Sequence, residues 1–387
     1  MHRPTWNPNM LVAPVDNGYV AYDPASDKLH ELNPIAALLS ELCDGTRTVQ
    51  EIHELVDPAL PEGSAGEIDR WLEEAANAGL LNLNGDTPGG VKELTAKELA
   101  ELARKLRKGG KTEAAYACAL RATERDPGDS DKWAYLAETA HILGRRAEAR
   151  SAYEKYLELE PDDLEVQHIM ISLRDEAPPA RMSNDAILYV YRKFAPHFDK
   201  NLCDELGYEA PQRLQGIVES ILGAREGLSV LDLGCGSGLA GVRFKPRAAS
   251  LTGVDLSPEM IELARARGIY DQLEVSEITE WLGRATQKFD LVIGCDCFIY
   301  FGDVSQLTVP AAKVLRPGAL FAFTLEKGKK YPFVLTDSGR YEHDPQHVRE
   351  AAKAAGLRVE LLEEGFLRTE YGEDVIGLFV VLRKPDV

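Results

Sequence analysis

The residues with the clearest chemical purpose are three closely spaced glycines, Gly234, Gly236 and Gly238. Because glycine lacks a Cβ atom, the backbone can turn sharply there and approach a ligand closely. The apolar run before these glycines is typical of a buried parallel strand, and it contains Asp232. A second apolar run ends in Asp255, 21 residues after Gly234. An acid at this spacing can accept hydrogen bonds from both hydroxyls of a ribose, so the pattern predicts a nucleoside-containing ligand.

Two nucleoside cofactors fit this pattern, a nicotinamide dinucleotide and S-adenosylmethionine. Asp232 can pair with an ammonium group, which S-adenosylmethionine has and the dinucleotide lacks. Residues 288–296 read as a later strand that brings Asp296 to the carboxyl edge of the sheet, where ligands bind. A tight turn at 315–318 then leads into a further strand over 319–325. These features favour S-adenosylmethionine and methyl transfer.

The order of strands, glycine loop and acids resembles the class I S-adenosylmethionine-dependent methyltransferases over residues 185–384. The resemblance implies a Rossmann-like domain with a seven-stranded sheet, whose final antiparallel pair is expected over 357–361 and 375–382. It places the glycine loop under the methionine moiety of the cofactor. The cofactor-binding residues that it implies are Asp232, Gly234, Cys235, Gly236, Gly238, Asp255, Leu256, Met260, Glu277, Ile278 and Phe198.

Three of these assignments leave alternatives open. Met260 is either an adenine contact or ordinary helix core. Glu277 is either an adenine ligand or a solvated carboxylate, because the family usually has Asp there. Phe198 can share a helical face with Phe194, and it either covers the cofactor or packs against the sheet. Residues 185–225 are expected to form lid helices.

Candidate catalytic residues come from two further loops. Asp296 and Tyr300 lie in CDCFIYF, which differs from the Asp/Asn-Pro-Pro-Tyr motif of the amide and exocyclic-amine methyltransferases. Arg340 and His343 lie in SGRYEH, which resembles methyltransferases that carry tetratricopeptide repeats. Arg340 could hold a carboxylate through two hydrogen bonds, and His343 could be a base or only a solvated loop residue. Asp296 could also be a helix cap, and oxygen and nitrogen both remain possible as the methylated atom.

The middle of the chain contains an internal repeat. Leu102 and Leu136 are 34 residues apart, as are Gly110 and Gly144. This is the tetratricopeptide period, in which each unit is a pair of helices. A third, capping helix is expected over 164–174. Two units bury little surface alone, so this short all-α solenoid should dock on a neighbouring domain, either as a spacer or as a peptide groove.

The first 85 residues have the spacing of a winged helix, with strand patterns over 10–15, 18–22 and 28–32 and helices that begin near Pro34, Thr48 and Gly66. Asn33, Asp44-Gly45 and Thr48 are the main points at which this segment resembles the PqqD-like domains, also called RiPP recognition elements. The resemblance implies that a precursor's leader peptide adds as a strand beside 28–32 and lies against the helix over 67–77. A DNA-binding winged helix is the alternative, and the acidic character of that helix disfavours it.

Composition limits the partners and the compartment of the protein. The 387 residues carry a formal net charge of −19, which argues against a nucleic-acid partner. No apolar run is long enough for a membrane span and no signal peptide is apparent, so a cytoplasmic location without membrane attachment is expected. The six cysteines lack paired spacing, which predicts neither a metal site nor disulfides. The oligomeric state stays open.

The length exceeds one methyltransferase domain of about 200 residues, so the sequence predicts a multidomain α/β protein. The expected parts are a PqqD-like domain over 1–85, tetratricopeptide helices over 94–177 and the methyltransferase domain over 185–387. Together they predict an S-adenosylmethionine-dependent enzyme that methylates a ribosomally synthesised precursor peptide. The alternatives are a small-molecule natural-product methyltransferase and a non-catalytic peptide-binding scaffold.

Overall fold

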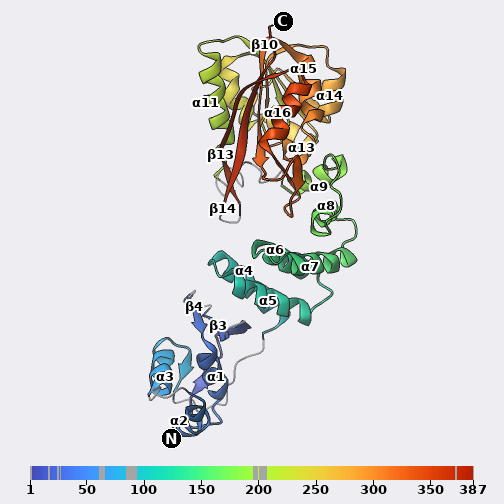
Figure 1. Cartoon of the computed structure of the whole chain (residues 1–387). Coiled ribbons are helices and arrows are strands. Elements are labelled where there is room, and N and C mark those ends of the chain that lie inside the picture. The colour runs from blue at the N-terminus through green and yellow to red at the C-terminus, as the bar shows by residue number, and fades with distance from the viewer. Residues whose placement is uncertain are drawn as a thin grey trace. The chain divides into compact units, whose positions relative to one another are not determined.

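The computed structural model describes residues 2–15, 18–23, 26, 28–60, 66–83, 94–194, 199, 207–370 and 373–386. Its internal contacts divide the chain into two compact units, Met1–Pro161 and Asp162–Val387. Figure 1 shows the helices and strands of both units.

The N-terminal unit contains the strands and helices that the sequence predicts, together with β1, η1 and β5, which were not predicted. Their bounds are β1 Thr5–Trp6, β2 Leu11–Val15, β3 Gly18–Asp23, β4 Lys28–Leu32, α1 Pro34–Leu42, α2 Val49–Val56, η1 Asp57–Ala59, α3 Glu67–Asn77 and β5 Leu81–Asn82. The side chain of Asn33 caps α1, and Thr48 forms a reciprocal capping box with Glu51 at the start of α2. β2, β3 and β4 form an antiparallel sheet in that order, so β4 is an edge strand within the described residues. β1 pairs with β5 in a separate small sheet.

Four helices complete this unit as two helix pairs. Their bounds are α4 Ala96–Lys108, α5 Thr112–Arg125, α6 Ser130–Ile142 and α7 Arg146–Leu159. Gly110 and Gly144 follow α4 and α6 with φ values of 76° and 69°, a conformation that glycine adopts without strain. The helices and turns therefore lie where the 34-residue period places them. Their assignment to the tetratricopeptide type stays a prediction.

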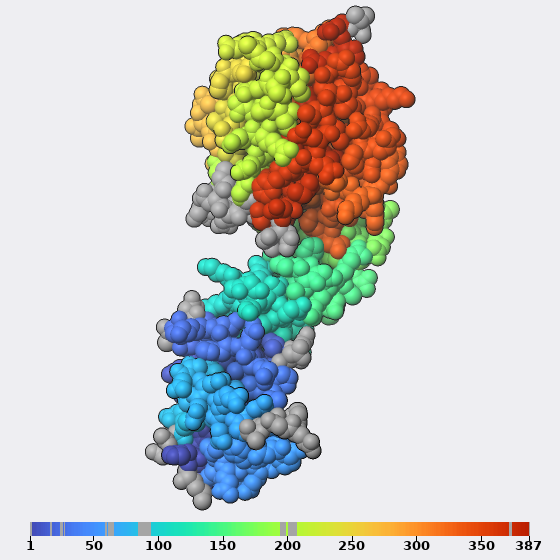
Figure 2. All heavy atoms as spheres, turned by 60° about the vertical axis from the view of Figure 1, so that its left-hand side comes forward, coloured from blue at the N-terminus to red at the C-terminus, as the bar shows by residue number. Residues whose placement is uncertain are grey.

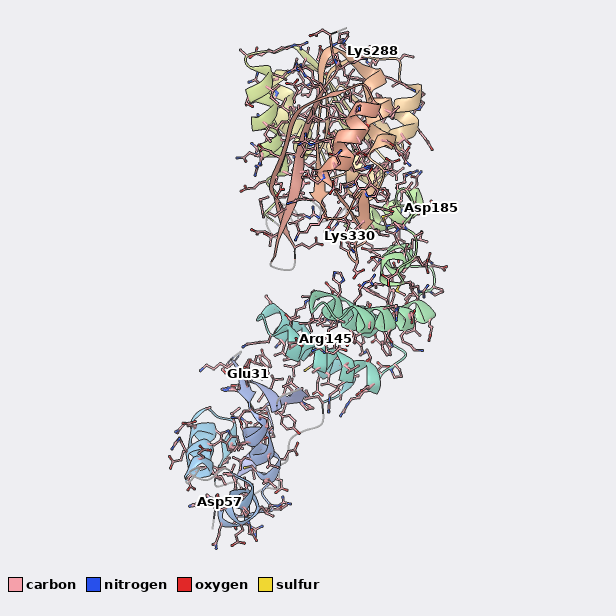
Figure 3. The ribbon with its side chains drawn as sticks, in the orientation of Figure 1. Glu31, Asp57, Arg145, Asp185, Lys288 and Lys330 are labelled. Atoms are coloured by element: carbon pink, nitrogen blue, oxygen red, sulfur yellow. The ribbon has the colours of Figure 1, made fainter. Side chains whose placement is uncertain are left out.

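The first helix pair packs on the β2–β4 sheet. The Lys105 ammonium group donates to the Tyr22 hydroxyl at 2.8 Å, and Lys111 pairs with Glu31 of β4, labelled in Figure 3, at 2.7 Å. Alternate residues of a strand face opposite sides of the sheet. Ala21 of β3 faces the core that includes α1, whereas Val20 and Tyr22 are buried on the other face. The sheet is thus covered on both faces, and the predicted docking of the helices on a neighbouring domain is present within this unit.

The C-terminal unit is built on a mixed sheet of Rossmann-like topology. The strands are β6 Leu228–Leu233, β7 Ala248–Asp255, β8 Gln272–Val275, β9 Phe289–Gly294, β10 Leu315–Lys327, β11 Phe333–Leu335, β12 Tyr341–His343, β13 Arg358–Glu370 and β14 Glu373–Arg383. β8, β7, β6, β9 and β10 are parallel neighbours in that order, and β14 pairs antiparallel with both β10 and β13.

Within the described residues the sheet has nine strands in place of the predicted seven. The additional strands are β11 and β12, a hairpin whose second strand pairs with Glu326 and Lys327 of β10. These partners lie beyond Phe323, the last β10 residue paired with β9, so the hairpin extends the sheet past its carboxyl edge. The predicted turn at 315–318 lies inside β10 as a shift of register, with Gly318 at a φ of 72°.

Helices cover both faces of this sheet, as Figure 1 shows. Their bounds are α8 Leu164–Leu173, α9 Asn184–Phe194, α11 Ala210–Leu222, α12 Leu239–Phe244, η4 Lys245–Arg247, α13 Pro258–Ala266, α14 Ile278–Arg284, η5 Phe298–Tyr300, α15 Ser305–Val314 and α16 Pro345–Ala354. One buried core lies under α14, α15 and α16, and another lies under α11 and α12. Figure 2 shows α11 at the surface beside the last strands, where Arg213 pairs with Glu363 at 3.0 Å. None of the helices in the described ranges is long and apolar enough to cross a membrane.

Helix α8 belongs to the C-terminal unit, although the sequence assigns it to the repeat segment over 94–177. Ser172 donates to the carbonyl oxygen of Leu335 at 3.0 Å, and the His168 ring lies 6.1 Å from that of Tyr341. Both partners belong to the β11–β12 hairpin. The helix is therefore packed on a hairpin that the sequence did not predict, which explains the different boundary.

Candidate functional site

The candidate site lies at the carboxyl edge of the parallel strands. The strand order reverses between β6 and β9, and ligands of open α/β sheets bind at such a switch point. In Figure 3, Lys288 marks the opposite edge, just before β9, and Lys330 follows β10 at the carboxyl edge. Asp185 of α9 lies toward the Lys330 end in that view, so the first lid helix lies on the site's side of the sheet.

The glycine loop follows β6 with the backbone that its sequence predicts. Gly234, Gly236 and Gly238 have φ values of 63°, 53° and 94°. A Cβ atom at Gly234 would lie 2.5 Å from the Cβ of Cys297, which follows β9. Cys235 is buried, and its backbone N–H donates to the carbonyl of Val254. The loop is thus held between the ends of two strands, and side chains larger than hydrogen do not fit at its first position.

Asp255 is held by backbone N–H groups. One carboxylate oxygen accepts from the N–H of Gly236 at 2.8 Å, and the other accepts from the N–H of Ser257 at 2.9 Å. Burial raises the pKa of this carboxyl group. The adjacent Leu256 packs against the same small apolar cluster, around Ile187, as Tyr191 and Tyr300. The carboxylate has a fixed orientation beside the glycine loop, and each oxygen retains acceptor capacity.

Asp232 is a buried carboxylate with one oxygen unsatisfied. Its side chain is 1% exposed, and Oδ2 accepts from the Tyr270 hydroxyl at 2.7 Å. Oδ1 has no hydrogen-bond partner among the described residues. Burial raises the pKa of Asp232 to about 7. A buried oxygen without a donor is costly, so this position suits a ligand that brings a cationic donor.

Glu277 is also buried, which makes the solvated-carboxylate alternative wrong. It is 5% exposed and caps α14, where Oε2 accepts from the N–H of Glu280 at 2.9 Å. Oε1 has no hydrogen-bond partner in the described part of the chain, and its nearest cation is Arg181 at 3.9 Å. Ile278 follows and is nearly buried, and Met260 is fully buried in α13, as helix packing alone would require.

Phe198 and the side chain of Phe194 lie outside the described residues, so the structure does not test the lid role of Phe198. Asp199 is described, and its carboxylate bonds the side chains of Ser237 and Arg267. Ser237 belongs to the glycine loop. This contact links the segment after α9 to the loop.

A buried charge network lies beyond the loop, and its central residue was not predicted. Arg368 of β13 is 3% exposed, and its Nη1 lies 2.9 Å from both carboxylate oxygens of Asp296. Its Nη2 bonds Glu326 of β10. Asp296 has a φ of 54°, and its N–H donates to Thr324 Oγ1 at 2.8 Å. Asp296 is therefore the partner of an arginine from a distant strand, and no side-chain cap of η5 is seen.

Arg340 and Tyr300 join the same network. Arg340 pairs with Glu370, so the carboxylate clamp predicted for it already has an internal partner. The Tyr300 ring lies 6.2 Å from that of Tyr191 in α9, and the two hydroxyls are hydrogen-bonded. Burial raises the pKa of both tyrosines, so they stay protonated at neutral pH. Tyr191 lies within residues 185–225, where the sequence predicts lid helices, but its sequence context did not indicate this contact.

His343 differs most from its prediction. It lies in β12 and not in a solvated loop, its side chain is fully buried, and Nε2 lies 2.7 Å from the Phe301 carbonyl oxygen. Burial lowers its pKa to about 4. The burial of the ring and its contact with a backbone carbonyl do not favour His343 as a base.

We expect His343 to make the fold sensitive to acid. The His343 ring takes up a proton at about pH 6.5 in the unfolded chain and only at about pH 4 in the folded chain. The contribution of the neutral, buried ring to folding stability is therefore complete above pH 6.5 and is lost as the pH falls to 4. The loss amounts to about 3 kcal/mol in the free energy of unfolding. Urea unfolding at several pH values measures it, with His343→Gln as the non-titrating comparison. Equal acid losses in both proteins would contradict the assignment.

Comparisons with known proteins agree with this geometry. Residues 230–318 match the family model described as "Methyltransferase domain", and residues 18–81 match "Coenzyme PQQ synthesis protein D (PqqD)". The chain carries a methyltransferase domain and a PqqD domain. S-adenosylmethionine is the cofactor, and the unsatisfied oxygens of Asp232 and Glu277 fit its polar groups.

Three similar proteins illustrate the range of relatives. The Ubiquinone biosynthesis O-methyltransferase of Coxiella burnetii is 28% identical over 167 residues, which is 38% of this chain and 70% of that protein. Human Methyltransferase-like protein 27 is 31% identical over 142 residues, 35% of this chain and 56% of the other. The structure of 1,6-didemethyltoxoflavin-N1-methyltransferase from Burkholderia thailandensis is 20% identical, covers 55% of this chain and 93% of its own, and has a TM-score of 0.42.

We expect Asp255→Ala to weaken S-adenosylmethionine binding about 10- to 100-fold, because a ribose would lose a charged hydrogen-bond acceptor. Calorimetry measures this affinity. Asp290→Ala is a suitable control, since that carboxylate also accepts a backbone N–H, but from Ser229 at the amino end of β6, opposite the loop. Unchanged affinity in Asp255→Ala would remove this residue from the cofactor site.

Proposed function

We propose that this chain methylates a ribosomally synthesised precursor peptide that its PqqD domain recruits. The observation that carries the proposal is the presence of both domains in one chain. A peptide-recognition domain has a clear purpose beside a catalytic domain when the substrate is a peptide, because tethering raises the local substrate concentration.

The recruitment surface in this proposal is the edge of β4 together with α3. β4 pairs only with β3 among the described residues, so its other edge is available for strand addition. The α4–α5 turn reaches this edge, where Lys111 pairs with Glu31. A peptide strand added there would meet the first helix pair as well as the PqqD domain.

The donor half of the site is assigned as follows. Asp255 would hold the ribose, the unsatisfied oxygen of Asp232 would receive the ammonium group, and that of Glu277 would receive the adenine amine. When bound, S-adenosylmethionine supplies an electrophilic methyl group on its sulfonium. The glycine loop allows the backbone to approach it. The chain's main contribution is orientation, which can lower the barrier by about 7 to 11 kcal/mol.

The acceptor half suits an uncharged oxygen or nitrogen better than a carboxylate. Arg340 and Arg368 both act electrostatically on Tyr300, and both already have carboxylate partners. Asp296, Glu326 and Glu370 outnumber these two arginines. A substrate carboxylate would add like charge to a buried acidic cluster, whereas the protonated Tyr300 hydroxyl can orient a neutral acceptor.

A second candidate function is methyl transfer to a small molecule. The relatives from Coxiella burnetii and Xylella fastidiosa are named ubiquinone biosynthesis O-methyltransferases, and their matches cover 38% and 34% of this chain. In that case the N-terminal unit would have another role.

Co-expression with each short peptide reading frame beside the gene tests the proposal. We expect one peptide to gain the mass of one methylene group, and tandem mass spectrometry locates the modified atom. A matched co-expression with Asp255→Ala controls for methylation by the host. Modification of a small phenolic acceptor such as catechol, with every neighbouring peptide left unmodified, would favour the second candidate.

A further inference from the structure

Tyr270 occupies a space that three glycines leave open beneath the cofactor loop. It lies in the connection between α13 and β8. A Cβ atom at Gly241 would lie 2.1 Å from the Tyr270 hydroxyl oxygen, one at Gly253 would lie 2.9 Å from the ring, and one at Gly238 would lie 3.1 Å from it. Side chains on β7, on α12 or in the loop would therefore displace this ring.

The ring's position directs its hydroxyl to Asp232. The hydroxyl donates to Oδ2 at 2.7 Å, and the backbone N–H of Gly241 also bonds this carboxylate. Burial raises the pKa of Tyr270, so the hydroxyl remains a donor at physiological pH. Both donors leave Oδ1 unsatisfied within a side chain that is almost fully buried.

We propose that Tyr270 is the positioning residue of the donor site, which holds Asp232 so that its unsatisfied oxygen receives the ammonium group of S-adenosylmethionine. Without this hydrogen bond, the carboxylate can rotate about its own side-chain bonds, and its second oxygen also loses a donor. The glycines at 238, 241 and 253 then serve the cofactor indirectly, by admitting the tyrosine ring. The proposal concerns the donor half of the site and does not depend on the identity of the acceptor.

Two ligands separate this role from general packing. S-adenosylhomocysteine contains the ammonium and carboxylate groups, whereas 5′-methylthioadenosine contains the adenosine and a methylthio group but neither of these charged groups. In Tyr270→Phe, which keeps the ring, we expect the calorimetric affinity for S-adenosylhomocysteine to fall about tenfold. The affinity for 5′-methylthioadenosine should stay within about twofold, since Asp232 does not face a cation in that complex.

A double-mutant cycle with Asp232→Asn makes the test sharper. If Tyr270 acts through Asp232, adding Tyr270→Phe to Asp232→Asn should weaken S-adenosylhomocysteine binding by much less than tenfold. Tyr341→Phe is the matched control. It also removes a tyrosine hydroxyl that forms a hydrogen bond, with the Pro179 carbonyl at 2.8 Å, but Tyr341 lies on the β11–β12 hairpin. We expect that variant to bind both ligands normally.

Three outcomes would overturn the proposal. Equal losses for both ligands would show that Tyr270 only supports the shape of the loop. Unchanged affinity for both would show that Asp232 needs no support, and full additivity with Asp232→Asn would show that the two residues act separately. If Tyr270→Phe does not fold, the binding of both ligands to Asp232→Asn alone still decides, because equal losses there would remove the ammonium role on which Tyr270 depends.

Discussion

Removing residues 1–161 should raise the KM for a full-length precursor about 10²- to 10⁴-fold, while kcat at saturation stays within about twofold. The expected effect is large because the first unit would no longer hold the leader peptide near the catalytic unit. Residues 162–387 form a compact unit of their own, so the remaining chain keeps its internal contacts. Initial rates at a series of precursor concentrations give both constants.

Two controls make this result interpretable. Thermal unfolding and calorimetric binding of S-adenosylhomocysteine show whether the shortened chain is folded, and a core peptide without its leader should be methylated equally by both proteins. A normal KM for the full-length precursor in the folded, shortened enzyme would disprove recruitment by the first unit.

Arg368→Ala should lower the free energy of unfolding by about 3 to 5 kcal/mol, because Asp296 and Glu326 would be left buried without their cation. Urea unfolding of the two proteins measures the difference. Arg358→Ala is the matched control on the same strand. Arg358 also pairs with a carboxylate, that of Glu360, but its own side chain is largely exposed. We expect that variant to change the free energy of unfolding by less than about 1 kcal/mol.

Measurements on the same two variants can also contradict this prediction or show which half of the site the network supports. If both substitutions have small effects, the network around Arg368 is hydrated and does not depend on this ion pair. If Arg368→Ala binds S-adenosylhomocysteine normally once folded at low temperature, the network supports the acceptor half of the site and not the donor half.

The parts predicted well from the sequence are those with local signals. Asn33 and Thr48 begin helices because their side chains cap backbone N–H groups a few residues later. Gly110 and Gly144 follow the ends of helices because glycine adopts positive φ values without strain. The glycine loop follows from a spacing of two residues. Each of these features needs only neighbours in the chain, so a pattern of residue types reveals it.

The parts that were missed depend on contacts between distant segments. Arg368 meets Asp296 across 72 residues of chain, and no property of the sequence near either residue indicates the pairing. His343 lies in a short strand whose pairing with β10 involves only two residues, Glu326 and Lys327. Helix α8 has the repeat's spacing, yet its packing partner is the β11–β12 hairpin. Tertiary packing, and not local preference, decided these positions.

The burial of the second face of the β2–β4 sheet has a practical consequence for engineering hybrid enzymes. Val20 and Tyr22 lie on this face, and Lys105 of α4 bonds Tyr22. A PqqD domain exchanged at residue 85 would arrive with a face not shaped for α4 and α5, and would leave apolar surface open to aggregation. Hybrids that retarget the enzyme to new leader sequences should therefore be joined near Pro161, where the compact units divide, so that recognition domain and first helices are transferred together.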